Sequence, residues 1–383
     1  VPPLYRSAGY AERTPAHARL MRAAAGGRIP VAQIIGKSAL GGVAACILNY
    51  YSHMGRGRDR FDFFTYGPSP FDEKLHGIDP EAKVFYIPSL DKTFYKAVPA
   101  LKKLLAEGGY PIVHSHMTTL SAFALHAAKK AGVPVRICHA HSTFDRQSDH
   151  WIIKSILRPF AAKDATHLMA CGSAAAENLY RARAKEAYIL PNAIDLEHFA
   201  PDAGEKNALG FSGRLLLFAG RFANQKNLFF LLDAFATARK REAMTLALVG
   251  GGEQEQALRA HTEKLGIADS VRFVPPCDPA PYYAAADLFC LPSLYEGFPV
   301  VGVEAQAAGL PCLFSDKITR EADLCGDNAF LPLDAGVWAE EMLRPRKKTE
   351  HPAQILREKH YDICAEAQRL AAYYGAAPDG LHG

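Results

Sequence analysis

The sequence contains no run of about 18 apolar residues, the length that a membrane-spanning helix requires. The N-terminus lacks the charged and then apolar stretch, with a small-residue cleavage site, that marks a secretory signal. None of the eight cysteines forms a C-x-x-C pair, so we expect reduced core residues rather than disulfides or zinc ligands. A cytoplasmic protein is the expectation from these absences.

Two nucleotide-binding signatures are also missing. G-x-G-x-x-G does not occur, and a P-loop through Gly36 would need glycine at position 31, where Val31 stands. The segment Gly36–Gly42 nevertheless follows a predicted strand and precedes a predicted helix. Its backbone N–H groups would there be able to approach an anion. The alternative is a turn that glycine merely eases.

The length and charge of the chain suggest its organisation. At 383 residues it exceeds what one core usually fills, so two domains are expected. The net charge of +4 hides an asymmetry. Residues 1–195 hold 25 Lys and Arg against 15 Asp and Glu, whereas residues 196–383 hold 19 against 25. A basic first half suggests an anionic partner such as a membrane surface, a phosphorylated lipid or a nucleic acid; a solvated surface without a partner is the alternative.

Short apolar runs alternate with helix-length segments from Val31 onward. This pattern predicts an α/β protein with mostly parallel sheets, each covered on both faces in a doubly wound arrangement. The helices expected from it lie near residues 43–54, 94–106, 120–131, 151–161, 228–241 and 253–265.

Breaks in the alternation predict the domain boundaries. The expected parts are a leader, treated as a flexible arm, at 1–29, a first domain at 30–195, a linker at 196–212, a second domain at 213–352 and a C-terminal segment at 353–383. Apolar residues at helical spacing in Ala353–Tyr374 predict one helix there, which packs back on the first domain.

Two carboxylates, Glu296 and Glu304, lie in LYEGFPVVGVEAQAAGL (294–310). Nearly all of the remaining residues in this segment are apolar or small. Pro299 suits the first position of a helix that contains Glu304. Since a buried carboxylate without a partner is costly, we expect Glu304 at the edge of a pocket, where hydroxyl groups of a ligand satisfy both acids. The alternative places Glu304 on the solvated flank of an amphipathic helix.

Two cations follow the first predicted strand of the second domain, and ligands of doubly wound sheets bind at such strand ends. Arg221 and Lys226 lie five residues apart in AGRFANQKN (219–227), where both side chains are able to contact a diphosphate. Gly250 to Gly252 follow the next strand and would leave room for a ligand. The alternative is two solvated cations beside a turn.

Histidines occur at the ends of two strands of the first domain. His114 and His116 lie in VHSHMTT, and His139 and His141 lie in ICHAHST. Alternate residues of a strand share one face, and four histidines are enough to bind a metal. Because no Asp, Glu or Cys accompanies them at ligand spacing, we predict a polar cleft wall that faces the second domain.

Taken together, these residues resemble the retaining glycosyltransferases of family 4, whose GT-B fold has two facing Rossmann-like domains. The resemblance runs from about Val31 to Tyr374 and rests first on the E-x7-E signature from Glu296 to Glu304. AGRFANQKN and PNAIDLEHF (191–199) also fit. The strings VHSHMTTLSAF and RICHAHST are similar to bacterial capsular and exopolysaccharide glycosyltransferases.

The resemblance implies transfer of a sugar from a nucleotide-sugar donor, most commonly a UDP-sugar in this family. Glu304 would bind the ribose, and Glu296 would bind the donor sugar. Arg221 and Lys226 would neutralise the diphosphate leaving group. The remaining residues implied in nucleotide-sugar binding are Gly41, Gly42, Gly220, Pro276, Cys277, Gly297 and Phe298.

The resemblance also implies that His116 and His141 line the reacting centre. The acceptor would be a glycan or a lipid-linked sugar in polysaccharide biosynthesis. Such enzymes use no cofactor and no bound metal, which fits the absence of a D-x-D motif. No nucleic-acid partner is expected.

Two other functions compete with this interpretation. A different GT-B enzyme, such as a sugar-nucleotide epimerase or a phosphorylase, would share the fold. A two-domain sugar-binding protein would also close its lobes on a sugar. The missing export signal counts against a binding protein, and so do Arg221 and Lys226 beside Glu304.

Two segments of the first domain would allow peripheral contact with an anionic membrane at its inner face. One helix carries Lys92, Lys96, Lys102 and Lys103, and the other carries Trp151, Ile152, Ile153, Lys154, Ile156, Leu157 and Arg158. Amphipathic core helices explain the same residues.

Overall fold

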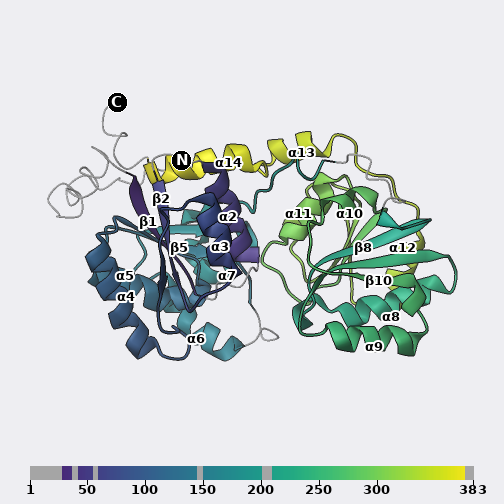
Figure 1. Cartoon of the computed structure of the whole chain (residues 1–383), viewed down its shortest axis with the longest axis horizontal. Helices are drawn as coiled ribbons and strands as arrows, with labels where there is room; N and C mark the ends of the chain where they lie inside the picture. Colours follow the sequence, from purple (N-terminus) through teal and green to yellow (C-terminus); the bar gives the residue numbers. More distant parts are fainter. Residues whose placement is uncertain (1–27, 37–41, 55–58, 145–149, 201–208, 376–383) are drawn as a thin grey trace. The chain divides into compact units, whose positions relative to one another are not determined.

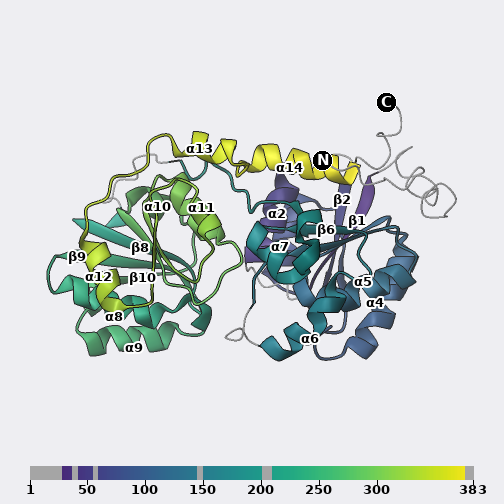
Figure 2. The same ribbon diagram turned by 180° about the vertical axis from the view of Figure 1, so that it is seen from behind.

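The computed structural model describes residues 28–36, 42–54, 59–144, 150–200 and 209–375. The chain forms two compact units, which Figures 1 and 2 show from opposite sides. Unit 1 contains the chain up to Asn192 and again from Ile363, and unit 2 is Ala193–Asp362. In each unit helices cover both faces of a parallel sheet, which confirms the predicted fold class.

Unit 1 has a seven-stranded sheet in the order β3-β2-β1-β4-β5-β6-β7. Its strands are β1 (Ile29–Gly36), β2 (Asp59–Thr65), β3 (Val84–Tyr86), β4 (Ile112–Ser115), β5 (Val135–Ala140), β6 (His167–Ala170) and β7 (Tyr188–Ile189). Its helices are α2 (Gly42–Met54), α3 (Pro70–Ile78), α4 (Phe94–Gly108), η1 (Thr118–Leu120), α5 (Ser121–Lys130), α6 (Trp151–Ala161), α7 (Ser173–Tyr180), η2 (Arg181–Glu186) and α14 (Ile363–Gly375).

Unit 2 has a six-stranded sheet in the order β10-β9-β8-β11-β12-β13. Its strands are β8 (Arg214–Arg221), β9 (Met244–Gly251), β10 (Val271–Val274), β11 (Leu288–Leu291), β12 (Cys312–Ser315) and β13 (Ala329–Leu331). Its helices are η4 (Asn224–Lys226), α8 (Leu228–Arg239), α9 (Glu255–Leu265), η5 (Ala268–Ser270), α10 (Ala280–Ala285), α11 (Val300–Ala307), η6 (Arg320–Ala322), α12 (Ala335–Leu343) and α13 (Pro352–Glu358).

The sheet order places a switch point in each unit. In unit 1 the chain builds outward from β1 to one side and from β4 to the other; in unit 2 the same occurs at β8 and β11. At such a pair the connections leave in opposite directions and open a crevice at the carboxyl ends of the strands, where ligands of doubly wound sheets bind. The central strands read as continuous apolar runs such as LLLF and LFCL because both faces of the sheet are covered.

Among the described residues four α-helices were not expected from the sequence, namely α3, α7, α10 and α12. Helix α3 illustrates why, since it buries only Phe71 and Leu75, too few for a clear apolar period. Its start is nevertheless defined by Ser69, whose side chain accepts a hydrogen bond from the backbone N–H of Phe71, and by Pro70 in the first turn.

The prediction of one helix across Ala353–Tyr374 is wrong. Helix α13 ends at Glu358, His360 has a left-handed φ of 68°, and α14 begins at Ile363. The residues between the two helices bond to another part of the chain instead of continuing the helix. The N–H of Ile194 donates to the carbonyl oxygen of Tyr361 over 3.0 Å. As predicted, the final helix packs on the first domain, where α14 contacts α2.

The unit boundaries differ from the predicted ones. Residues 193–195 and 353–362 lie in unit 2, although the sequence placed them with the first domain and with the C-terminal segment, respectively. Most of the predicted leader, residues 1–27, lies outside the described residues, as do residues 201–208 of the predicted linker. All eight cysteines lie within the described residues and none forms a disulfide; most are buried, as predicted. Across the described ranges, none of the helices has both the length and the apolar character needed to cross a bilayer.

Candidate functional site

In unit 2 the chain segments that follow β8 and β11 meet at the switch point. The carbonyl oxygen of Gln225 accepts a hydrogen bond from the N–H of Leu294 over 2.8 Å. In return the side-chain Nε2 of Gln225 donates to the carbonyl oxygen of Tyr295, also over 2.8 Å. These two bonds join the η4 turn to the loop that carries Glu296, so residues about 70 positions apart in sequence form one edge.

Lys226 and Glu296 form an ion pair at this edge. Lys226 Nζ lies 2.5 Å from Glu296 Oε1, and the side chains are only 15% and 9% exposed. Gln225 Nε2 donates to the other oxygen, Oε2, over 3.3 Å. A cation and a carboxylate held together at a strand end can contact an anionic group and hydroxyl groups of the same ligand.

Arg221 has a different environment. Its Nη2 lies 3.0 Å from Oε2 of Glu253, and both side chains are mostly exposed. Such exposed pairs contribute little to stability, so Arg221 is able to exchange Glu253 for a phosphate at low cost. The structure thus gives each predicted cation its own carboxylate partner within unit 2.

Glu304 lies inside α11, as predicted, although Pro299 precedes the helix rather than occupying its first position. The hydroxyl of the fully buried Tyr283 donates to Glu304 Oε2 over 2.9 Å. Burial raises the pKa of Glu304 to about 7, against the opposing effects of Tyr283, His198 and Lys226. This burial supports the edge of a pocket rather than a solvated flank.

The other predicted donor-site residues are distributed around the same end of the sheet. Gly297 and Phe298 are buried just before α11, and the ring of Phe298 stacks on Tyr361 with centroids 5.5 Å apart. Pro276 and Cys277 are exposed in the loop after β10. Gly220, near the end of β8, has a φ of 143° that other residues rarely adopt.

Glycine is needed at positions 250 and 252 for a reason that the sequence alone did not reveal. A Cβ on Gly250 would lie 2.0 Å from the carbonyl oxygen of Gly220, and a Cβ on Gly252 would lie 2.5 Å from that of Phe222. These glycines are required because the ends of β8 and β9 approach closely. Space for a ligand is not needed to explain them.

In unit 1 the predicted residues lie at the switch point between β1 and β4. Gly42 is exposed at the start of α2, whereas Gly41 lies outside the described residues. The N–H of His116, just after β4, donates to the carbonyl oxygen of Ile34 over 2.9 Å. His141 directly follows the neighbouring strand β5.

The four histidines form a buried cluster. Ring centroids of His114 and His116 lie 4.1 Å apart, and those of His139 and His141 lie 3.8 Å apart, so each pair shares a face as predicted. Across the strands, His114 Nε2 lies 3.0 Å from His139 Nδ1, and His116 Nδ1 lies 2.7 Å from His141 Nε2. His114 and His139 are only 1% and 2% exposed, so the prediction of a polar cleft wall is wrong for this inner pair; His116 and His141 are 7% and 9% exposed.

Gln33 and Tyr374 give these hydrogen bonds a direction. Gln33 Nε2 donates to the hydroxyl oxygen of Tyr374 over 3.3 Å, so the Tyr374 proton is donated to His114 Nδ1 over 2.6 Å. His114 then carries its proton on Nε2 and donates to His139. On the other side Gln33 Oε1 accepts from His116 Nε2 over 2.8 Å, which leaves His116 Nδ1 to accept from His141.

Burial keeps the cluster neutral. It lowers the pKa of His114, His116 and His139 well below the ordinary value, and it lowers the pKa of His141 to about 3. The buried Nε2 of His139 has no hydrogen-bond partner within the described chain. The assigned directions leave Nδ1 of His141 as the acceptor at the strand end.

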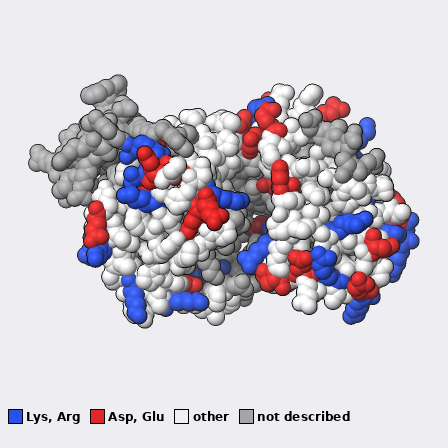
Figure 3. Space-filling model, in the orientation of Figure 1, with Lys and Arg blue, Asp and Glu red and all other residues white. Residues whose placement is uncertain are grey.

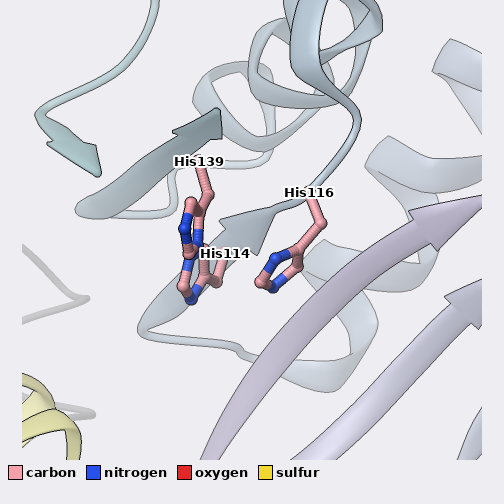
Figure 4. A group of neighbouring side chains, drawn as sticks. All are labelled: His114, His116 and His139. Carbon is pink, nitrogen blue, oxygen red and sulfur yellow. The ribbon is translucent and has the colours of Figure 1, made fainter. Parts of the chain in front are cut away.

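Three of these histidines meet a geometric requirement for a metal site. Figure 4 shows His114, His116 and His139, which offer ligand atoms within 4.8 Å of one another. However, His114 and His139 lie at hydrogen-bond distance from each other, and His116 is bonded to Gln33. The ring nitrogens that share protons in this way are already satisfied, and of the three histidines only His139 keeps a nitrogen, Nε2, that is unpaired among the described residues. One such nitrogen does not make a metal site, so the donors favour a hydrogen-bonded network over a metal centre.

Residues that position the predicted groups were missed by the sequence analysis. Gln225 orients Glu296, Tyr283 orients Glu304, and Gln33 and Tyr374 orient the histidines. No local pattern distinguishes them, since each contacts a group at least 21 positions away. Gln33 gave the one weak signal, as a polar residue inside an otherwise apolar strand.

Family models match both units. The model described as "Glycosyltransferase Family 4" matches residues 40–198, and that described as "Glycosyl transferases group 1" matches residues 213–345. The putative glycosyltransferase EpsF of Bacillus subtilis (strain 168) is 33% identical over 370 residues, which cover 89% of this chain and 95% of EpsF.

Two further proteins are informative. The UDP-Gal:alpha-D-GlcNAc-diphosphoundecaprenol alpha-1,3-galactosyltransferase of Escherichia coli is 29% identical, with 62% of this chain and 67% of that protein covered. The crystal structure of Anabaena HepE in complex with UDP and glucose has a TM-score of 0.77 at 19% identity, and covers 91% of this chain and 100% of HepE. These similarities and the two Rossmann-like units show that the chain belongs to the family 4 glycosyltransferases, with a GT-B fold.

Proposed function

We propose that this glycosyltransferase moves a sugar from a UDP-sugar to a lipid-linked glycan in polysaccharide biosynthesis, with retention of the anomeric configuration and without a bound metal. The observation that carries the proposal is the Lys226–Glu296 pair across the switch point of unit 2. HepE binds UDP and glucose, and the Escherichia coli relative is named for a UDP-galactose donor and a diphosphoundecaprenol-linked acceptor. Both names support the substrate classes proposed.

Each residue of the donor site has a role in this proposal. Glu304 accepts hydrogen bonds from the ribose hydroxyls, and Glu296 accepts them from the donor sugar. Lys226 and Arg221 neutralise the diphosphate. Gly297 and Phe298 offer backbone N–H groups to the same part of the ligand. Because two fixed cations supply the positive charge that a divalent metal supplies elsewhere, the proposal needs no metal.

The reaction follows from this charge arrangement. The bond between the anomeric carbon and the phosphate oxygen breaks, and the acceptor oxygen bonds to the anomeric carbon on the same face. The acceptor proton passes to the departing phosphate oxygen. Lys226 stabilises the negative charge that grows on this phosphate, an effect usually worth about 10² to 10³ in rate for one well-placed donor.

The acceptor belongs to unit 1 in this proposal. His116 and His141 are neutral and buried at the ends of adjacent strands. Because both ring nitrogens of His116 already bond to Gln33 and His141, Nδ1 of His141 is the atom that accepts a hydrogen bond from the acceptor hydroxyl, without adding charge. A lipid-linked acceptor confines the reaction to a membrane surface. We therefore place the enzyme at the cytoplasmic face of the membrane as a peripheral protein.

A time course of UDP-glucose turnover by NMR tests donor, stereochemistry and metal together. Without acceptor we expect slow release of UDP, with the sugar appearing first as the α anomer, at a rate that EDTA leaves unchanged. The β anomer first would contradict retention, and a loss of turnover that Mg²⁺ restores would contradict metal independence. Conversion to another UDP-sugar without UDP release would identify an epimerase instead.

A further inference from the structure

Helix α6 presents an apolar face to solvent. Its exposed large side chains are Trp151, Ile152, Ile153, Ile156 and Phe160, each between 38% and 63% exposed. Since Ile152, Ile156 and Phe160 are spaced four residues apart, they form one stripe along the helix. Within this fully described helix only its last residue is buried. A surface helix of a soluble domain normally turns such a stripe toward the core, so the stripe of α6 is directed at something outside unit 1.

Helix α4 provides a contrast within the same unit. Its exposed aromatic residues, Phe94 and Tyr95, are confined to the first turn. Beyond that turn it buries Ala97, Leu101 and Leu105 and exposes Lys102 and Lys103, which is the ordinary arrangement of an amphipathic helix. From the sequence, both helices were candidates for contact with a membrane. The structure separates them, because the apolar face of α4 lies in the core and that of α6 does not.

The surroundings of α6 are basic. The helix has no acidic residue in WIIKSILRPFA. A groove of about 350 Å³ beside it is lined by four cations, Arg158, Lys163, Arg181 and Arg183. Burial and the neighbouring Arg181 lower the pKa of Arg158. Like charges gathered next to an apolar stripe favour a surface that is both apolar and anionic.

The charges elsewhere on the protein also favour an anionic surface at α6. Arg183 pairs with Glu186 at 2.9 Å, and both side chains are about half exposed, so that pair is weak and screened. On the face drawn in Figure 3, acidic side chains are spread over unit 2 and are sparser on unit 1. An anionic surface would therefore meet less repulsion at unit 1.

The apolar helix lies close to the proposed acceptor edge. Helix α6 contacts η1, which begins two residues after His116. The connection from β5 to α6 starts at His141. A surface that contacts α6 is thus close to both strand ends that carry the acceptor-side histidines.

We propose that α6 and the basic groove beside it dock the enzyme on a bilayer that contains anionic lipids. The stripe enters the interfacial region, and the cations contact the headgroups. This inference rests on the proposed function, because a lipid-linked acceptor must be reached from the membrane surface. A polar protein partner would leave the apolar stripe unmatched.

The chain has two tryptophans, and their positions make fluorescence a direct probe. Trp151 is exposed on α6, whereas Trp338 is fully buried in α12 of unit 2. Adding vesicles of phosphatidylglycerol and phosphatidylcholine is expected to shift the emission to shorter wavelength, and pure phosphatidylcholine is expected to do so less. Trp151→Phe should abolish the shift while the protein still sediments with vesicles.

Paired substitutions separate the apolar and basic parts. Ile152→Ser with Ile156→Ser is expected to weaken vesicle cosedimentation about tenfold or more. Lys163→Glu with Arg181→Glu is expected to remove the preference for anionic lipid. The matched controls are expected to keep vesicle binding within about twofold, because they make comparable changes of charge or apolar area at exposed positions elsewhere. These controls are Lys102→Glu with Lys103→Glu on α4, and Val337→Ser on α12.

Three results would overturn the docking surface. They are absence of binding to anionic vesicles at low salt, equal binding by the α6 variants and controls, and sedimentation evidence that α6 is covered by a second copy in solution. Release of UDP from a UDP-sugar should be unchanged in every α6 variant. If the wild type also fails to release UDP, the proposed function falls, and vesicle binding alone then decides the docking surface.

Discussion

Replacing Glu304 by Gln should abolish most of the pH dependence of nucleotide-sugar binding. In the wild type, burial raises the pKa of this carboxyl from 4.5 to about 7. Ribose hydroxyls donate hydrogen bonds, so they favour the ionised carboxylate. Below about pH 7 the protein must lose this proton before it binds well, and each pH unit then costs about tenfold in affinity. Between about pH 7.5 and about pH 5.5 the association constant should fall about 25-fold.

The same shift affects stability with a definite sign. Glu304 holds its proton more tightly in the folded protein than in the unfolded chain. The resulting stabilisation is present below about pH 4.5 and is lost as the pH rises through about 7. A pKa difference of about 2.5 units corresponds to at most about 3.4 kcal/mol. Glu304→Gln should therefore lose less stability than the wild type between about pH 5 and about pH 8.

Calorimetry with UDP-glucose is the appropriate assay, because its diphosphate has no group that titrates near neutral pH. The groups around Glu304 are Tyr283, His198, Asp278 and Lys226. His198 lies 2.9 Å from Asp278 and is the histidine among these groups. The control is therefore His198→Gln, which should keep the slope. A slope that persists in Glu304→Gln and disappears in His198→Gln would refute the reasoning.

Three further predictions concern the histidine network, the strand ends and the cation. Tyr374→Phe should lower the free energy of unfolding by about 1–3 kcal/mol, because it leaves His114 Nδ1 buried and unpaired. ¹⁵N NMR should show a changed His114 tautomer, and an unchanged spectrum would contradict the hydrogen-bond network. Gly250→Ala should lower the free energy of unfolding, measured in urea, by about 3 kcal/mol or more. The control Gly77→Ala has open space around the added Cβ and should be neutral or stabilising. Equal effects of the two substitutions would contradict the close approach of the ends of β8 and β9. Lys226→Ala should lower kcat by about 10² or more and change donor affinity less; unchanged kinetics would remove Lys226 from the mechanism.

Much of the fold could be predicted because strand and helix periods are strong in a doubly wound protein. Helix α6 was predicted with its observed bounds, Trp151–Ala161, because its apolar run is bounded by polar residues. Helix α10, with six residues, gave too short a period to recognise. The break between α13 and α14 was not predicted for another reason. It is stabilised by the hydrogen bond between Ile194 and Tyr361, which are far apart in sequence.

The candidate site was only partly predictable. Glu296 and Glu304 stood out because acids are rare in an apolar segment, and the strand ends located Arg221 and Lys226. Their partners did not stand out, since Gln225 and Tyr283 occupy ordinary positions that gain meaning only from packing. The histidines were located correctly, but their burial depended on α14, which returns to unit 1 after the whole of unit 2.

The central claim is that unit 2 holds a nucleotide-sugar donor through Lys226, Glu296 and Glu304. Calorimetric titration of the protein with UDP tests it most directly. We predict that UDP binds at a single site and that Glu304→Ala weakens this binding at least about tenfold, because the ribose loses its hydrogen-bond acceptor. No binding of UDP, GDP or ADP by the wild type would contradict it.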